Sequence, residues 1–267
     1  METPLPMEVR PRPPGIPGVR RGMTVDRSAS HGSNADGKGP ARWRFAEVVG
    51  RLVELSSHTG KNLIDRTGGR DPNRQRSGRA TAVLTLALAL VRDAQRCGET
   101  TAWVGVDADL FFPPDAARTG VDLAALPIVR APRSADVPRA AERLVRSGAF
   151  GLVILDLGSA GSRVRIPPAL LNRLAALARE HEAAVVCLTE KSDDAASLGP
   201  LISLRAAARR APLSPSSTDS GSTDLDSGHG TCLAILDVLR DRRRPGRWTD
   251  ALPCRAPEGV ESLLPTS

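Results

Sequence analysis

Residues 151–156 read Gly-Leu-Val-Ile-Leu-Asp, an apolar run that ends on a carboxylate. An uninterrupted apolar run of this length is typical of a strand buried on both faces of a parallel sheet. A second such run, residues 183–188, follows a helical segment at residues 167–181. The order strand, helix, strand with short connections predicts a parallel sheet that carries helices on both faces.

The same alternation continues upstream of this unit. Further strands are expected at residues 51–56, 101–106 and 126–130, and helices at residues 42–51, 77–96, 113–118 and 137–145. Downstream, residues 202–208 and 232–239 resemble strands with no helix between them, which predicts antiparallel edge strands. The sequence therefore predicts one α/β domain over residues 41–249, with a mostly parallel central sheet flanked by helices.

Four segments lack this periodicity. Residues 1–40 are rich in Pro, Gly, Ser and Arg, and we expect them to form a disordered basic tail. Within the domain we expect an exposed polar loop over residues 57–76 and a disordered Ser- and Asp-rich insert over residues 211–230. Residues 250–267 are expected to form a flexible C-terminal tail.

The composition of the 267 residues restricts the class of protein. The formal net charge is +7, and all but three of the 37 basic residues are arginines. Arginine suits phosphate contacts, but a chain so rich in Ala, Gly and Pro also fits a GC-rich coding bias, which we rank first. The four cysteines form no C-x-x-C pair, so we expect neither a disulfide framework nor a metal site. Without an apolar run long enough for a bilayer or a secretory signal, the expected location is the cytoplasm.

A turn between strand and helix has the spacing of a phosphate-binding loop. In such a loop, backbone N–H groups hold phosphate, a lysine reaches the β- and γ-phosphates, and a hydroxyl binds Mg²⁺. The corresponding residues here are Ser77, Gly78, Arg79, Ala80 and Thr81. The glycine is kept, but arginine replaces the lysine and alanine replaces the hydroxyl. An ordinary helix start is the alternative interpretation.

Four acids follow predicted strands. Asp156, Asp107, Asp109 and Glu190 each come at or just after the end of an apolar segment. Because the carboxyl ends of parallel strands meet at one edge of the sheet, we expect these acids to converge there. Asp156 has the position of a Walker-B aspartate that holds Mg²⁺. Each acid could instead cap a turn or a following helix.

Arg240 and Arg242 lie in a basic turn after the last predicted strand. Arginines in this place would contact a nucleotide across a subunit interface or neutralise a nucleic-acid backbone. A solvated charged turn is the structural alternative.

Taken in order, these segments resemble the core of RecA, the bacterial recombinase. Residues 50–55 (Gly-Arg-Leu-Val-Glu-Leu) resemble the strand before the RecA phosphate loop, and residues 77–81 (Ser-Gly-Arg-Ala-Thr) resemble its Ser-Gly-Lys-Thr-Thr. Residues 146–156 resemble the Arg-Ser-Gly-Ala segment and the Walker-B strand that follows it. Shorter likenesses lie at residues 107–109, 118–122, 185–190, 203–205 and 238–245. The likeness covers about residues 50–245.

The resemblance implies a RecA-like P-loop core with a degenerate nucleotide site. Asp109 would be the vestige of the catalytic acid, and Glu190 would replace the nucleotide-sensing glutamine. The implied nucleotide contacts are Ser77, Gly78, Arg79, Ala80, Thr81, Asp156, Arg240 and Arg242. Because the lysine, the hydroxyl and the glutamine are missing, we expect negligible ATPase activity and no required cofactor. Weak binding of ATP with Mg²⁺ through Arg79 remains open.

Within the family, the chain resembles the short ImuA-type paralogues that accompany damage-induced, error-prone DNA synthesis. This implies a non-catalytic adaptor in bacterial DNA repair and SOS mutagenesis. Its expected partners are a RecA-type filament or a translesion polymerase complex, with single-stranded DNA as a further candidate and no membrane. Two alternatives stay open: an ATP-dependent, single-stranded-DNA-binding recombinase with an atypical phosphate loop, and a cytosolic α/β scaffold unrelated to DNA.

Overall fold

The computed structural model describes residues 42–57, 72–106, 111, 113–157, 166–212 and 231–255, all in the unit that begins at Ala41. For residues 72–81, 212, 231 and 255 only the backbone is described. The predicted tail 1–40, residues 58–71 of the predicted loop, Asp109, the insert from residue 213 to 230 and the last twelve residues lie outside the described residues.

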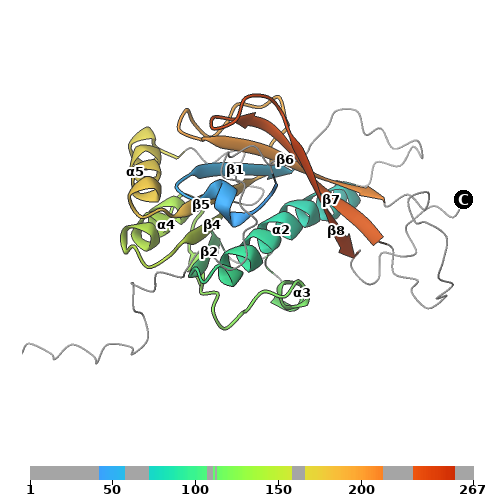
Figure 1. The fold of residues 1–267 in the computed structure, drawn as a ribbon, viewed down its shortest axis with the longest axis horizontal. Coiled ribbons are helices and arrows are strands. Elements are labelled where there is room, and N and C mark those ends of the chain that lie inside the picture. Colours follow the sequence, from blue (N-terminus) through green and yellow to red (C-terminus); the bar gives the residue numbers. More distant parts are fainter. Residues whose placement is uncertain are drawn as a thin grey trace, which may run out of the picture. The chain divides into compact units, whose positions relative to one another are not determined.

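The described strands form one eight-stranded sheet in the order β3-β2-β4-β5-β1-β6-β7-β8 (Figure 1). The strands are β1 (Leu52–Ser57), β2 (Thr101–Val106), β3 (Ile128–Ala131), β4 (Leu152–Asp156), β5 (Ala184–Thr189), β6 (Leu204–Pro212), β7 (Thr231–Asp241) and β8 (Thr249–Arg255). Pairing is parallel from β3 to β6, whereas β7 is antiparallel to both β6 and β8. The predicted α/β class, the mostly parallel sheet and the antiparallel edge strands are confirmed.

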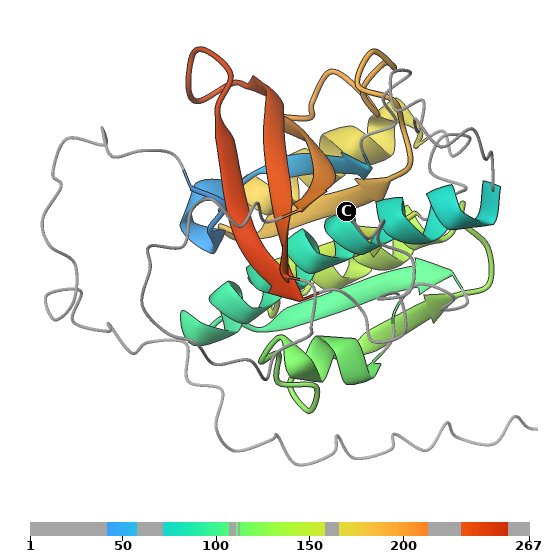
Figure 2. The same cartoon turned by 90° about the vertical axis from the view of Figure 1, so that its right-hand side faces the viewer.

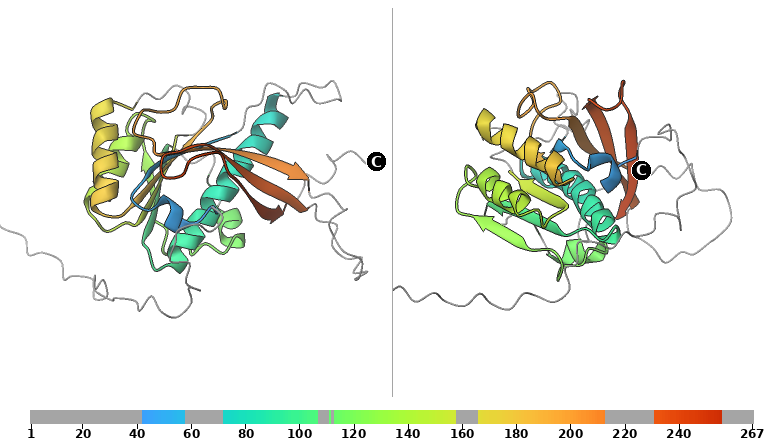
Figure 3. Two further views of the ribbon diagram at one scale, coloured as in Figure 1. Left: turned by 45° about the horizontal axis from the view of Figure 1, so that its top comes forward. Right: turned by 60° about the vertical axis from the view of Figure 1, so that its left-hand side comes forward.

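Helices cover both faces of this sheet. They are α1 (Phe45–Val48), α2 (Pro72–Arg96), α3 (Pro113–Arg118), α4 (Val137–Arg146) and α5 (Pro168–Glu180). The long α2 crosses one face, and α4 and α5 lie side by side on the other (Figures 2 and 3). None of the helices in the described part of the chain is long and apolar enough to cross a membrane.

The alternation of side chains along each strand divides the core into two layers. Val53 and Leu55 of β1 face the cluster that contains the apolar residues of α2. Leu52, one position earlier, faces the cluster that contains α4 and α5. Both faces of β1 are thereby buried, which explains why its sequence lacks a clear polar and apolar alternation.

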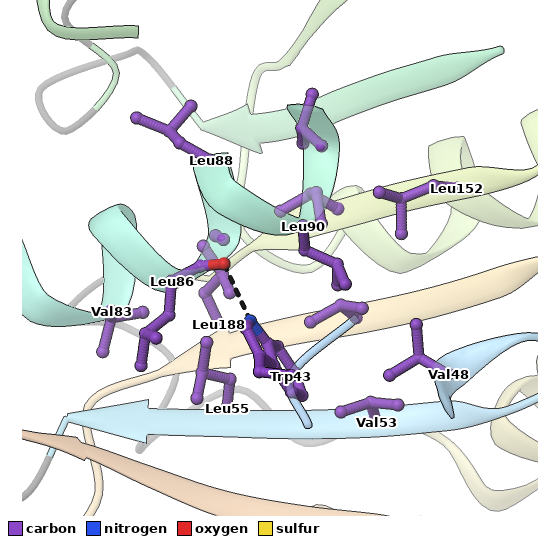
Figure 4. Close-up of a cluster of buried hydrophobic side chains, with 14 of the residues drawn as sticks. Trp43, Val48, Val53, Leu55, Val83, Leu86, Leu88, Leu90, Leu152 and Leu188 are labelled. Carbon is purple, nitrogen blue, oxygen red and sulfur yellow. Dashed lines mark hydrogen bonds between the residues drawn. The ribbon is translucent and has the colours of Figure 1, made fainter. Parts of the chain in front are cut away.

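The segment around α1 forms hydrogen bonds with both α2 and the outer strand β8. The indole Nε1 of Trp43 donates a hydrogen bond to the carbonyl oxygen of Leu86 in α2, at 2.9 Å (Figure 4). The backbone N–H of Trp43 donates to Asp250 Oδ2 at 2.6 Å, and that of Phe45 donates to Asp93 Oδ2 at 2.7 Å. Trp43 therefore connects α2 with β8, two elements far apart in the sequence.

Helix α2 begins earlier than predicted, at Pro72 rather than at residue 77. Proline is favoured at the first helical position, where its missing N–H has no partner to lose. Gly78 then lies inside the helix, at a cost of about 1 kcal/mol relative to alanine. The predicted polar loop is thus too long at both ends, since Ser57 belongs to β1 and residues 72–76 are helical.

Two predicted irregular segments also begin with regular structure. Strand β6 continues through Pro212, so the first two residues of the predicted insert are part of it. The prediction of a flexible tail from residue 250 is wrong over β8, because Leu252 and Cys254 alternate onto the core and Trp248 packs there too. This strand was not predicted because Asp250 and Pro253 are residue types that are uncommon in strands. Proline is nevertheless tolerated in an edge strand, where an N–H can go without a partner.

Candidate functional site

The carboxyl ends of β2, β4, β5 and β1 lie next to one another because these strands are adjacent and parallel. Asp156 is the last residue of β4, and Glu190 directly follows β5, the neighbouring strand. Two of the four predicted acids therefore come to neighbouring strand ends, as expected. Asp107 and Asp109 lie outside the described residues.

Asp156 lies at the end of an otherwise apolar strand and is 9% exposed. Leu152 and Ile154 contribute to the cluster beneath α2, and the strand alternation places Asp156 on that same face. Its cross-strand neighbour in β2 is Gly105. A Cβ atom at position 105 would lie 3.3 Å from Asp156 Cβ, so the glycine leaves room for the carboxylate.

The connections that leave this edge diverge to opposite faces of the sheet. Strand β1 leads to α2 on one face, whereas β4 leads to α5 on the other. In open α/β sheets, the crevice outside the strand ends at such a divergence is where ligands bind. Asp156 and half-buried Glu190 lie at this place.

The residues predicted to cradle phosphate lie within α2. Ser77 is the sixth residue of the helix, so the backbone N–H groups of residues 77–81 are in its interior. Interior amides donate to carbonyl groups four residues earlier, and only the first four N–H groups of a helix stay available. A phosphate loop needs such available N–H groups. In this arrangement the segment 77–81 supplies none.

Sequence reasoning missed Glu54, a fully buried carboxylate in the middle of β1. Its side chain accepts hydrogen bonds from Ser197 Oγ at 2.7 Å, the backbone N–H of Leu198 at 2.9 Å and Thr189 Oγ1 at 3.4 Å. Lys191 Nζ lies 3.2 Å from Glu54 Oε1 and forms an ion pair with it. The available signal was a charged residue inside an apolar strand, since a buried charge requires partners.

The Glu54 contacts fix the segment that connects β5 to β6. Lys191, Ser197 and Leu198 all belong to it, and Lys191 Nζ also donates to the carbonyl oxygen of Ala196 at 3.2 Å. Moving this segment away would leave a charged carboxylate buried without partners, which is costly. The connection after β5 is therefore held against the sheet.

Arg240 and Arg242 lie at the opposite edge of the sheet from Asp156. Arg240 pairs with Arg205 near the start of β6, and β6 is parallel to β1. A strand of six residues spans roughly 17–20 Å, so the two edges are far apart. Arg240 donates to the carbonyl oxygen of Ile202 at 2.7 Å, and Arg242 donates to that of Pro200. Arg240 and Arg242 therefore do not join Asp156 at one site within this chain. Their expected contact with a nucleotide across a subunit interface, or with a nucleic-acid backbone, stays a prediction.

A buried ion pair between Arg51 and Asp241 organises this second edge, with side-chain exposures of 1% and 0%. Arg51 also donates to Ser203 through Nε and Nη2, at 3.0 Å to Oγ and 2.8 Å to the carbonyl oxygen. Burial alone raises the pKa of Asp241, but hydrogen bonds from Arg51 and the Arg243 backbone, with the Arg51 charge, hold that pKa below its ordinary value. We call this group of residues, Arg51, Ser203 and Asp241, the amino-edge clamp.

No family model matches this sequence, and no curated protein matches it either. Within the part of the chain that the structure describes, no group of three or more His, Cys, Asp or Glu side chains is arranged to hold a metal ion. The site is therefore defined by its geometry, an acid at the carboxyl ends of the central strands beside a helix.

Proposed function

We propose that this chain is a RecA-like accessory protein of bacterial DNA repair, acting without catalysis as an adaptor in damage-induced translesion synthesis. The observation that carries the proposal is a contrast at the carboxyl ends of the central strands, between the acid that lies there and the phosphate-binding amides that do not. Asp156 occupies the end of β4 beside the face covered by α2, whereas the amides of residues 77–81 are inside that helix. A nucleotide-type fold is kept and the phosphate cradle is lost.

The chemistry of the remaining side chains supports the absence of phosphoryl transfer. Arginine at position 79 and alanine at position 80 supply neither the lysine nor the hydroxyl that stabilise the transferred group. Losing one such preorganised electrostatic contact typically costs about 10²–10³ in rate. Losing the lysine, the hydroxyl and the backbone cradle together leaves too little stabilisation for measurable turnover.

The connection after β5, which is held by its contacts with Glu54, supports an adaptor rather than an ATPase that changes conformation. A nucleotide-dependent switch requires a segment with two arrangements of similar free energy. The bonds from Lys191, Ser197 and Leu198 to buried Glu54 favour one arrangement strongly. A fixed surface of this kind suits constitutive docking on a RecA-type filament or a translesion polymerase complex.

Two titrations of the full chain test the proposal. In the first, phosphate release from ATP with Mg²⁺ is measured for the wild type, for Asp156→Asn and for Asp115→Asn, a control in exposed α3. We expect all three to stay at background. Turnover that collapses only in Asp156→Asn would instead establish an ATP-dependent enzyme.

The second titration measures association with preformed RecA filaments and with a translesion polymerase complex, by co-sedimentation and by gel filtration. We expect one of these complexes to form and to survive Asp156→Asn. Single-stranded DNA is titrated in parallel across a salt series, where phosphate contacts would give affinity that falls steeply with salt. If the chain binds neither protein assembly, the adaptor proposal is wrong, and an unrelated α/β scaffold becomes the better interpretation.

A further inference from the structure

The hairpin at the edge of the sheet brings two cysteines together. Cys232 lies near the start of β7 and Cys254 near the end of β8. The register of the two strands places these two cysteines directly opposite each other. Their Sγ atoms are 2.6 Å apart, and both residues are half-buried thiols. Twenty-two positions separate the two cysteines in the sequence, so their spacing gave no signal of a pair.

The backbone at this position suits a covalent bond between the two sulfur atoms. Directly opposed residues of antiparallel strands have Cα atoms about 4.5–5.5 Å apart. A disulfide requires a Cα separation of about 4.4–6.8 Å, with both Cβ atoms on the same side. Opposed residues meet both conditions, so the bond can form without displacement of either strand.

We propose that Cys232 and Cys254 form an intramolecular disulfide that closes the open end of the β7–β8 hairpin when the chain meets a small-molecule disulfide such as oxidised glutathione. One cysteine thiolate attacks a sulfur of the glutathione disulfide, forms a mixed disulfide and releases one glutathione thiolate. The second cysteine then attacks the protein sulfur of that mixed disulfide and releases the other glutathione. The two protein thiols lose two protons and two electrons, and one glutathione disulfide becomes two glutathione molecules.

The bond would stabilise an outer strand of the sheet. Strand β8 is the outer strand on this side, and its pairing with β7 alone holds it in the ladder. Pro253, next to Cys254, has no N–H to donate to that ladder. The disulfide would join the hairpin into a ring and prevent the end of β8 from separating. This inference is independent of the proposed function, because it depends only on the register of β7 and β8.

The other two cysteines provide matched controls. Cys187 is fully buried in β5, where burial and the Glu54 carboxylate raise the pKa of its thiol. Cys97 is exposed just after α2. Among the described residues no cysteine lies opposite Cys97, so a glutathione adduct on it would report ordinary glutathionylation.

The first experiment measures the mass of the intact full chain after equilibration in glutathione buffers of increasing oxidised fraction, with remaining thiols blocked by N-ethylmaleimide. We expect a species that has lost two hydrogens and carries two fewer blocking groups, and a cross-linked peptide pair containing Cys232 and Cys254. The Cys97→Ser variant should give the same cross-link. Glutathione adducts on Cys232 or Cys254 that never resolve to the cross-link would overturn the proposal, as would a dimer bridged through either residue.

The second experiment compares thermal unfolding of the oxidised and reduced chain. Closing a loop of this size should raise the midpoint by about 10 °C in the wild type and in Cys97→Ser. The Cys232→Ser and Cys254→Ser variants should show no difference between the two conditions. An equal shift in these variants would assign the effect to another site and contradict the proposal, whereas the mass measurement on the wild type remains decisive if a variant fails to fold.

Discussion

The two edges of the parallel sheet place their charged residues in different surroundings. At the amino edge, the clamp of Arg51, Ser203 and Asp241 satisfies its charges internally, because the ion pair and its hydrogen bonds are all within this chain. At the carboxyl edge, Asp156 and Glu190 lie where the connections of neighbouring strands diverge, the usual place of a ligand site. Charge at a strand end is therefore informative about function only when its location on the sheet is known.

The largest expected effect comes from the amino-edge clamp. Replacing Arg51 with methionine leaves the Asp241 carboxylate buried without its ion-pair partner, which should lower the free energy of unfolding by about 3–5 kcal/mol. Urea denaturation followed by circular dichroism measures this loss. The double variant with Asp241→Leu should recover much of the stability, and failure to recover would show that Arg51 acts through its other hydrogen bonds.

The next effect concerns the buried carboxylate of β1. Glu54→Gln removes the charge that pairs with Lys191 and should cost about 2–4 kcal/mol. Because the connection after β5 loses its anchor, limited proteolysis should also begin to cut near Ser197. Adding Lys191→Met should restore part of the stability. Unchanged proteolysis in Glu54→Gln would mean that packing rather than the buried charge holds this connection.

The clamp also predicts how stability depends on pH. The pKa of Asp241 is lower in the folded chain than its ordinary value of about 3.9, so the folded state favours the ionised carboxylate. Its contribution is complete above the unfolded pKa and is lost as the pH falls through the lower, folded pKa. Urea titrations from pH 5 to pH 2 should show a steeper loss in the wild type than in Asp241→Asn; equal slopes would contradict the assignment.

The smallest effect is expected at the carboxyl edge. Gly105→Ala places a Cβ atom 3.3 Å from Asp156 Cβ and should cost about 1 kcal/mol through crowding. The double variant with Asp156→Ala should cost less than the sum of the two single changes. If the losses in unfolding free energy of the two single variants simply add, the crowding between position 105 and Asp156 is absent.

The sequence predicts the elements of this fold well because their periodicity is local. Strand β2 and helix α3 have the bounds that were expected, and the apolar runs of β4 and β5 are the buried central strands. Helix α2 is longer than predicted because the polar residues 72–76 were assigned to the preceding loop. Those residues show no apolar periodicity, although proline is favoured at the first position of a helix.

The sequence could not predict the pairings that matter for the sites. Whether Cys232 lies opposite Cys254 depends on the register of β7 with β8. Strand β8 itself was not predicted, because its sequence contains Pro253. The partners of Glu54 come from the connection after β5, whose path no periodicity describes. The distance between Arg240 and Asp156 depends on the strand order and on the direction of β7, which place the two residues at opposite edges of the sheet.

The two outer strands of the sheet have a consequence for how this protein meets other chains. Strand β3 is only four residues long, and β8 carries a proline within its ladder. Neither offers the long, regular row of N–H and C=O groups that another chain needs for edge-to-edge addition. The two outer strands are therefore poor templates for the strand of another chain, which limits edge-to-edge aggregation.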